Sequence, residues 1–290
     1  MFNPISSPII KKDLKVISRS MKFSWGLFAY EAVLAIVFLF SLSIAGIERS
    51  YSGISSNTDI YSGYVYFFPI IGITQLMIIA LIVPIITASS ISGERERKTM
   101  DVLMTTTTTP VNIILGKIGS AVVRVMIFVI ASIPLLSMSF MVGGLTWLAL
   151  LEYIVMAFFL ACFTGSVGIF SSSLCKKSIT AIILSYVIYL GIYGFPFVVM
   201  LIEYLIDINK TDFYVAPFAL LINPVFTFIV FFVDRMSGTD ILQIFGGSHG
   251  GLWNALRNPK IYIIISIVCQ VGLTALFVNL SSKRIGPGKK

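Results

Sequence analysis

Few residues in this chain have the types and spacing that catalysis requires. Ser248 and His249 lie within Gly246-Gly-Ser-His-Gly250, which matches the G-x-S-x-G pattern of serine hydrolases. That chemistry needs a histidine base on a separate element, but His249 is the single histidine of the chain and directly follows the serine. The three cysteines have no C-x-x-C partner. We therefore expect no catalytic, cofactor-binding or metal-ligating residues and no enzyme activity in this chain alone.

The composition indicates the environment in which the chain folds. Its 290 residues are 57% hydrophobic and 12% charged, with a mean hydropathy of +0.95, whereas soluble domains average about 25% charged residues. Long apolar runs exclude an outer-membrane barrel, whose strands alternate in polarity over about 10 residues. The net charge of +8 reflects membrane topology, and we expect the lipid bilayer rather than nucleic acid as a partner.

Six segments are long enough to cross a bilayer, which takes about 20 apolar residues. They are approximately residues 23–47, 64–92, 119–142, 147–174, 179–206 and 260–282. With the N-terminus inside, 16 of the 21 Lys and Arg residues fall in cytoplasmic pieces. We therefore expect a single six-helix transmembrane domain over residues 23–290, with both termini cytoplasmic.

A seventh apolar run, residues 213–233, is shorter and contains Pro217 and Asn223-Pro224. A seventh crossing would place the basic C-terminus outside and weaken the charge asymmetry. Broken helices at membrane depth occur where other protein covers them. We therefore expect external re-entrant helices within residues 207–259, before the last span.

The N-terminal residues 1–22 are amphipathic. Ile10, Leu14, Ile17 and Met21 recur at helical spacing with cations between them. This pattern predicts a cytoplasmic helix that lies in the membrane interface, with its cations near anionic headgroups. The alternative is a solvated tail.

The loop 93–117 separates the second and third spans. Glu94 and Lys98, like Arg97 and Asp101, are spaced to pair along a helix. Five threonines and Pro110 then end the helical pattern, before a short amphipathic piece that leads into span three. An apolar side is expected from Met100, Leu103 and Met104. Such a helix suits the groove of a partner protein, and the alternative is a solvated hairpin.

Polar residues within the spans mark a possible translocation path. Glu31 lies within span one, and Thr74 and Gln75 lie within span two. An ionisable residue within the membrane is a functional hypothesis by default. Three roles of Glu31 stay open: facing a dimer seam, pairing with a cation of the leading helix, or contacting substrate. Thr74 and Gln75 are equally suited to hydrogen bonding between helices.

Several motifs resemble those of the membrane (permease) subunits of type-2 ABC exporters. The resemblance covers nearly the whole chain, and its departures are Met100-Asp101, where Leu-Glu is commoner, and the five-threonine run. The segments that carry it are ISGERERKTMDVLMTTTTTPVNIILGK (91–117), NPISSPIIKKDLKVISRSMK (3–22), GSVGIFSSSLCKKSITAIILSYVI (165–188) and LINPVF (221–226).

This resemblance implies a half-transporter of a bacterial cell (inner or cytoplasmic) membrane. Such permeases pair as homo- or heterodimers, and each binds a cytoplasmic ABC ATPase. The chain has no phosphate-binding loop of the GxxxxGK[ST] type, so ATP and Mg would be bound by the partner ATPase. The resemblance makes the loop a coupling helix. Its ATPase-coupling residues would be Glu94, Arg95, Glu96, Arg97, Lys98, Met100, Leu103 and Met104.

The expected fold is an all-α integral membrane protein with six transmembrane helices, an interfacial leading helix, a coupling helix and external re-entrant helices. The expected function is ATP-driven export by alternating access, of an antimicrobial peptide or a hydrophobic drug-like compound. Two alternatives remain from the residues. One is a membrane sensor, immunity protein or scaffold that transports nothing, and the other is an intramembrane enzyme, which the position of His249 disfavours.

Overall fold

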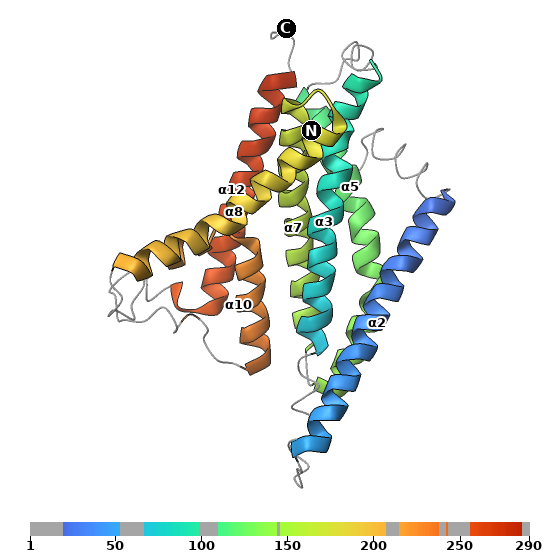
Figure 1. Cartoon of the computed structure of the whole chain (residues 1–290), viewed down its shortest axis with the longest axis vertical. Helices are drawn as coiled ribbons and strands as arrows, with labels where there is room; N and C mark the ends of the chain where they lie inside the picture. Colours follow the sequence, from blue (N-terminus) through green and yellow to red (C-terminus); the bar gives the residue numbers. More distant parts are fainter. Residues whose placement is uncertain are drawn as a thin grey trace. The chain divides into compact units, whose positions relative to one another are not determined.

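A computed structural model of the chain defines its helices (Figure 1). It describes residues 20–52, 67–98, 110–143, 146–206, 215–237, 242 and 256–285. Within these ranges every regular element is helical, and no strand occurs. The expected leading helix over residues 1–22 lies outside the described residues except at its end, where Met21 and Lys22 begin the first long helix.

Six helical segments of the described chain are long and apolar enough to cross a membrane. The prediction of an all-α integral membrane protein with six spans is confirmed. The six are α2 (Met21–Ser52), α3 (Phe67–Glu96), α5 (Pro110–Ala131) with α6 (Ile133–Gly143), α7 (Trp147–Leu174), α8 (Ser178–Ile206) and α12 (Pro259–Ile285).

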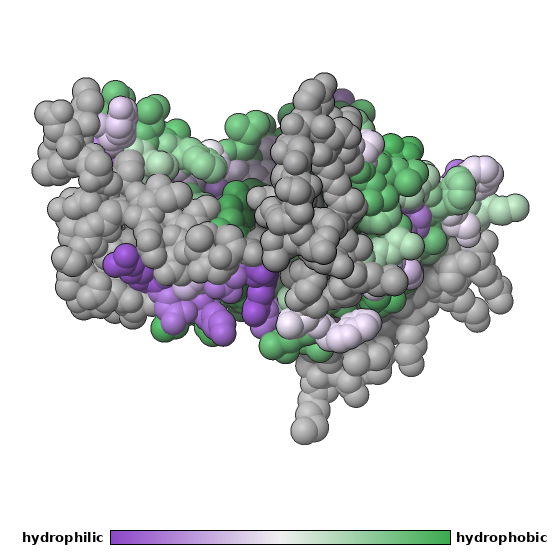
Figure 2. Space-filling view, turned by 90° about the horizontal axis from the view of Figure 1, so that it is seen from below, coloured by the Kyte–Doolittle hydropathy of each residue, from purple (hydrophilic) through white to green (hydrophobic). Residues whose placement is uncertain are grey.

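Large apolar side chains cover the outside of these helices. Trp25 is 68% exposed and Leu190 is 75% exposed, and Figure 2 shows hydrophobic residues at the surface of the described part. In a bilayer such a surface is favourable because lipid tails are as apolar as the side chains themselves. Helix α7 is the most enclosed of the six spans, with 67% of its most apolar stretch buried.

The third span begins earlier than the sequence pattern predicts. We expected a separate amphipathic piece before a span starting at residue 119, but α5 is continuous from Pro110. Proline is well suited to the first helical position, because its missing N–H would have no intrahelical partner there. The amphipathic piece therefore forms the first turns of α5.

The same span is broken near its far end. Ser132 lies in a turn between α5 and α6, and Pro134 is the second residue of α6. Proline removes one hydrogen bond of the helical ladder and clashes with the carbonyl four residues earlier. The interruption leaves Ser132 fully buried within the protein, where a broken transmembrane helix can be tolerated.

The chain divides into two compact units. The first contains Met1–Val83 and Leu115–Ala161, and the second contains Pro84–Ile114 and Cys162–Lys290. Within the first unit α2 contacts α6. Within the second, α8 contacts the short helix α9 (Ala216–Leu220), and α10 (Pro224–Ser237) lies beside α12 (Figure 1).

A buried polar network joins α10 to α12 in the second unit. Gln270 donates from Nε2 to the hydroxyl oxygens of Thr227 (3.1 Å) and Ser266 (3.0 Å). The Ser266 hydroxyl donates in turn to the carbonyl of Leu221 at 2.7 Å. These bonds satisfy polar groups that have no access to water. Helices α9 and α10 lie within the region expected to be re-entrant, and their placement in a membrane stays a prediction.

Candidate functional site

Five of the eight predicted coupling residues lie at the end of α3 and in the turn that follows it. Glu94, Arg95 and Glu96 form its last turn, and Arg97 and Lys98 form the turn that follows. Lys98 has φ of +56°, a left-handed conformation that ends a helix. The Glu94–Lys98 spacing therefore does not extend the helix past Glu96. Met100, Leu103 and Met104 lie outside the described residues.

The end of α3 is hydrogen-bonded to α7 through the buried Ser172. The backbone amides of Ile91 and Ser92 donate to Oγ of Ser172, at 3.0 and 2.9 Å. The Ser92 side chain donates to its own helix, at the carbonyl of Ala88 (2.8 Å). A serine from α7 thus bonds directly to the backbone of α3.

Arg95 binds the end of α7. Its Nη1 donates to the carbonyl oxygens of Ser173 at 3.0 Å and Cys175 at 3.2 Å. The last carbonyls of a helix have no intrahelical partner and carry partial negative charge. The guanidinium satisfies two acceptors at this helix end and opposes that charge.

Glu96 binds the beginning of α8. Its two carboxylate oxygens accept the Ser178 hydroxyl at 2.6 Å and the Ser178 amide at 3.2 Å. Lys177 and Arg97 also interact electrostatically with the Glu96 carboxylate. An anion at a helix N-terminus receives otherwise unsatisfied N–H groups and the positive end of the helix dipole. Adjacent residues of α3 thus bind the end of one helix and the start of the next.

One turn away, α3 and α7 approach closely at a glycine. A Cβ on Gly168 would lie 2.0 Å from Oγ1 and 3.0 Å from Cβ of Thr87. No larger side chain fits there without a shift of α3 or α7. Small residues at helix interfaces allow such close packing in membranes. We name Thr87, Ser92, Arg95, Glu96, Gly168, Ser172 and Ser178 the helix-end cluster.

Four cations surround the exposed side of the helix-end cluster: Arg97, Lys98, Lys176 and Lys177. All four side chains are exposed. Because Arg97 and Lys177 both act on the Glu96 carboxylate, the turn after α3 and the turn before α8 lie near each other. Their surface is basic and can bind an acidic partner.

The residues predicted for a translocation path belong to the first unit and differ in their surroundings. Thr74 donates only to its own helix, at the carbonyl of Ile70 (2.8 Å). Gln75 is fully buried, and its Oε1 accepts the Ser132 hydroxyl at 3.2 Å. Glu31 is half-buried, and its Oε1 is buried without a hydrogen-bond partner in the described part of the chain.

Three further residues of the first unit interact with one another or with these residues and were not identified from the sequence: Tyr30, Ser132 and Tyr153. Tyr30 interacts with Ser132 and Glu31, and Tyr153 donates to the carbonyl of Gly72 at 3.1 Å. Pro134 is a sequence feature that could have identified Ser132, because a proline predicts a break in the helix next to that residue. No comparable signal existed for two tyrosines among 12 in an aromatic-rich chain.

The described residues contain no group of three or more His, Cys, Asp or Glu placed to hold a metal ion. Ser248 and His249 lie outside these residues. The polar side chains described above therefore either make contacts at helix ends or lie buried inside the protein.

Comparison with known families identifies the chain. Residues 41–283 match the ABC-2 family transporter protein family. No curated protein sequence matches the chain. The matched region includes the last part of α2, the helix-end cluster and nearly all of α12. The chain therefore belongs to the ABC-2 family and is a multi-pass membrane (permease) subunit of an ABC transporter.

Proposed function

We propose that this permease is the membrane part of an exporter driven by a separate cytoplasmic ABC ATPase, and that the helix-end cluster transmits movement from that ATPase into the membrane. The observation that carries the proposal is the pair of contacts made by Arg95 and Glu96. One side chain binds the end of α7 and the next binds the start of α8.

These contacts divide residues 95–98 of the predicted coupling set into two kinds. Arg95 and Glu96 already bind α7 and α8, so we assign them a positioning role. Arg97 and Lys98 are exposed, so we assign them to direct contact with an acidic surface of the ATPase. Met100, Leu103 and Met104 remain proposed apolar anchors on the sequence pattern alone.

The mechanism follows from the shared hydrogen bonds. A displacement of the segment after α3 would pull on α7 and α8 together, because breaking the contacts of Arg95 and Glu96 would leave charged groups unsatisfied. ATP and Mg bound by the ATPase would supply the driving energy, through unequal contacts with the two states of the permease. Alternation between inward-open and outward-open states is the expected consequence.

The remaining parts of the proposal come from the sequence pattern and the family. A second permease completes the transporter, as a homo- or heterodimer. The charge asymmetry supports a bacterial cytoplasmic membrane with both termini inside. The proposed substrate, an antimicrobial peptide or a hydrophobic drug-like compound, rests on the family resemblance.

The test compares the Arg95→Ala/Glu96→Ala double variant with Lys260→Ala, an exposed change at the start of α12. Each variant is purified with the ATPases encoded near its gene, and ATP hydrolysis and transport into inverted vesicles are measured. We expect the double variant to retain the ATPase but to lose most transport per ATP hydrolysed. Normal transport by a folded double variant would contradict the positioning role, and absence of any bound ATPase would contradict the exporter proposal.

A further inference from the structure

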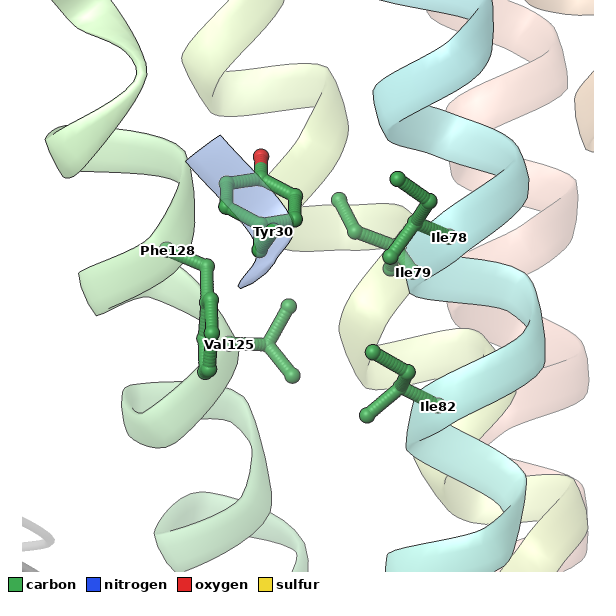
Figure 3. Close-up of a pocket in the computed structure, with 6 residues that line it drawn as sticks. All are labelled: Tyr30, Ile78, Ile79, Ile82, Val125 and Phe128. Carbon is green, nitrogen blue, oxygen red and sulfur yellow. The ribbon is translucent and has the colours of Figure 1, made fainter. Parts of the chain in front are cut away.

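The pocket beside Tyr30 in the first unit is too small to be a substrate site. It has room for about one water molecule. The side chains that line it are Tyr30, Ile78, Ile79, Ile82, Val125 and Phe128 (Figure 3). A substrate could enter this place only after helices move. In the second unit, one helix, α8, contains a segment at which such movement is possible.

The inner part of α8, residues 178–190, is anchored to α7. The buried side chain of Tyr189 donates a hydrogen bond from its hydroxyl to the carbonyl of Thr164 in α7. The Tyr189 ring also belongs to one apolar cluster with Phe163 and Val167 of α7. A polar and an apolar contact thus fix this part of α8 to its neighbour.

The outer part of α8, residues 197–206, is bound to α9 instead, and in Figure 1 it lies away from α7. The Glu203 carboxylate accepts the backbone amide of Val215 at 3.1 Å (Oε1) and 3.2 Å (Oε2), and that of Ala216 at 2.9 Å. Val215 precedes the first residue of α9, and its side chain cannot accept a hydrogen bond. Glu203 therefore takes the place of the capping side chain that α9 lacks.

A buried asparagine binds α8 just beyond the other end of α9. Asn223 is fully buried, and its Nδ2 donates to the carbonyl of Tyr193 in α8 at 3.2 Å. Its Oδ1 accepts the amide of Val225 in α10 at 3.0 Å. Residues 193 and 203 of α8 are about 15 Å apart along a helix. Helix α9 therefore runs back along α8 between two polar contacts.

Residues 191–196 lie between the two parts of α8 and have the composition of a helix bend. Pro196 lies inside the helix and has no N–H to donate to the carbonyl of Ile192. Gly191 and Gly194 precede it, and no atom among the described residues lies within 4 Å of a Cβ built on either glycine. Close packing within this chain therefore requires neither glycine. Because sharp helix bends occur mainly at proline and glycine, we name residues 191–196 the hinge segment.

We propose that the outer part of α8 and α9 move as one body about the hinge segment, and that Glu203 is the positioning residue that joins them. Separation of α9 from α8 would remove the amide donors of a charged carboxylate, which is costly. A bend at Pro196 breaks no hydrogen bond of its own, because that residue donates none. Bending is therefore the easier of the two movements.

The consequence for transport rests on the proposed exporter function. In that proposal α8 receives movement at Ser178, its first residue, through Glu96. The hinge segment then allows the outer part and α9 to take a different angle in each state of the permease. The contact near Asn223 lies at the hinge segment, where the displacement is smallest.

Spin labels test whether the two helices move together. In a cysteine-free permease, one pair of labels is placed at Tyr204→Cys and Phe218→Cys, on the outer part and α9. A second pair at Val187→Cys and Phe218→Cys spans the hinge segment, and all three native side chains are exposed. Electron paramagnetic resonance measures both distances in the purified permease, alone and in complex with its ATPase and a non-hydrolysable ATP analogue. We expect a narrow, constant distance for the first pair and a broader one that shifts with the analogue for the second.

Variants of Glu203 test its role as the joining residue. Glu203→Ala should broaden the distance distribution of the first pair and reduce transport per ATP hydrolysed. Glu203→Gln should restore part of both, because its remaining carbonyl oxygen still accepts from a backbone amide. Glu152→Ala, the same change at a glutamate of α7, should leave the distribution as in the wild type. An unchanged distribution in Glu203→Ala would overturn the assignment.

The Gly191→Ala/Gly194→Ala variant tests the hinge segment by stiffening it. Alanine fits at both positions and is favoured over glycine within helices. The midpoint of thermal unfolding should therefore rise while transport per ATP hydrolysed falls severalfold, a combination that a folding defect does not produce. Gly272→Ala, the same change in α12, should leave transport unchanged. Wild-type transport by the stiffened variant, or a lower midpoint, would contradict the hinge.

The outcomes separate this inference from the exporter proposal. If no ATPase binds but Glu203→Ala still broadens the first distance in the permease alone, the exporter proposal fails and the two-helix body remains. If coupling is normal but the first distance changes when the ATP analogue binds, the two-helix body alone is refuted.

Discussion

The carboxylate of Glu96 at the end of α3 accepts two hydrogen bonds from Ser178, the first residue of α8. One comes from the hydroxyl at 2.6 Å and the other from the backbone amide at 3.2 Å. The two residues are 82 positions apart in sequence. A side chain to which the family resemblance gave a role in ATPase coupling thus binds a helix of its own chain.

Removal of the Ser178 hydroxyl should weaken coupling less than removal of the Glu96 carboxylate. Ser178→Ala keeps the backbone amide, so one of the two hydrogen bonds remains, whereas Glu96→Ala loses both. We expect transport per ATP hydrolysed to fall in the order wild type, Ser178→Ala, Glu96→Ala. The control is Thr180→Ala, whose hydroxyl bonds only to the carbonyl of Lys177. Wild-type transport per ATP hydrolysed by Glu96→Ala would mean that this contact does not contribute to coupling.

The close approach of α3 and α7 predicts that Gly168 tolerates no larger residue. In Gly168→Ala the added Cβ would lie 2.0 Å from Thr87 Oγ1, so one helix must shift. We expect a loss of about 1–3 kcal/mol, the usual cost of overpacking, measured as a lower midpoint of thermal unfolding in detergent.

Two further variants test this interpretation of the Gly168 contact. One makes the same change at another glycine, and the other adds a substitution that removes part of the clash. No atom lies within 4 Å of the Cβ position at Gly272 in α12, so Gly272→Ala should be neutral or gain up to about 1 kcal/mol. Adding Thr87→Ala to Gly168→Ala should restore part of the lost stability, because Oγ1 is removed while Cβ remains 3.0 Å away. Full stability of Gly168→Ala alone would show that the two helices are not so close.

The polar network between α10 and α12 should contribute modestly to stability. Gln270→Leu removes two hydrogen bonds, to Thr227 and Ser266. Hydrogen bonds between transmembrane helices average about 0.6 kcal/mol, so we expect a loss of about 1 kcal/mol in detergent unfolding. Thr274→Val should cost less, since its hydroxyl bonds only to the carbonyl of Gln270 within α12. A larger loss for Thr274→Val would contradict this assignment.

The proposed orientation predicts which helix ends face the cell interior. In a cysteine-free background, Lys176→Cys at the turn between α7 and α8 should react with a membrane-impermeant maleimide only after permeabilisation. Lys260→Cys at the start of α12 should react in intact cells. Both lysines are exposed, so burial does not limit the reaction. The reverse pattern would place the N-terminus outside.

Only those features of the coupling segment that depend on neighbouring residues in the chain could be predicted from the sequence. The charge pattern of residues 94–98 predicts a helix there, and α3 includes Glu94–Glu96 but ends before Lys98. The left-handed turn at Lys98 was not visible, since lysine carries no strong turn preference. Nor could the partners of Arg95 and Glu96 be inferred, because they belong to α7 and α8.

The membrane class of this protein was determined by the sequence alone. Transfer of a helix into lipid depends on the summed hydropathy of about 20 consecutive residues, so the six spans follow from composition along the chain. Tertiary structure alone decided which residues meet: Glu96 with Ser178, Thr87 with Gly168, and Gln75 with Ser132. These contacts depend on the register and rotation of packed helices. Local hydropathy specifies neither, because nearly every face of these helices is apolar.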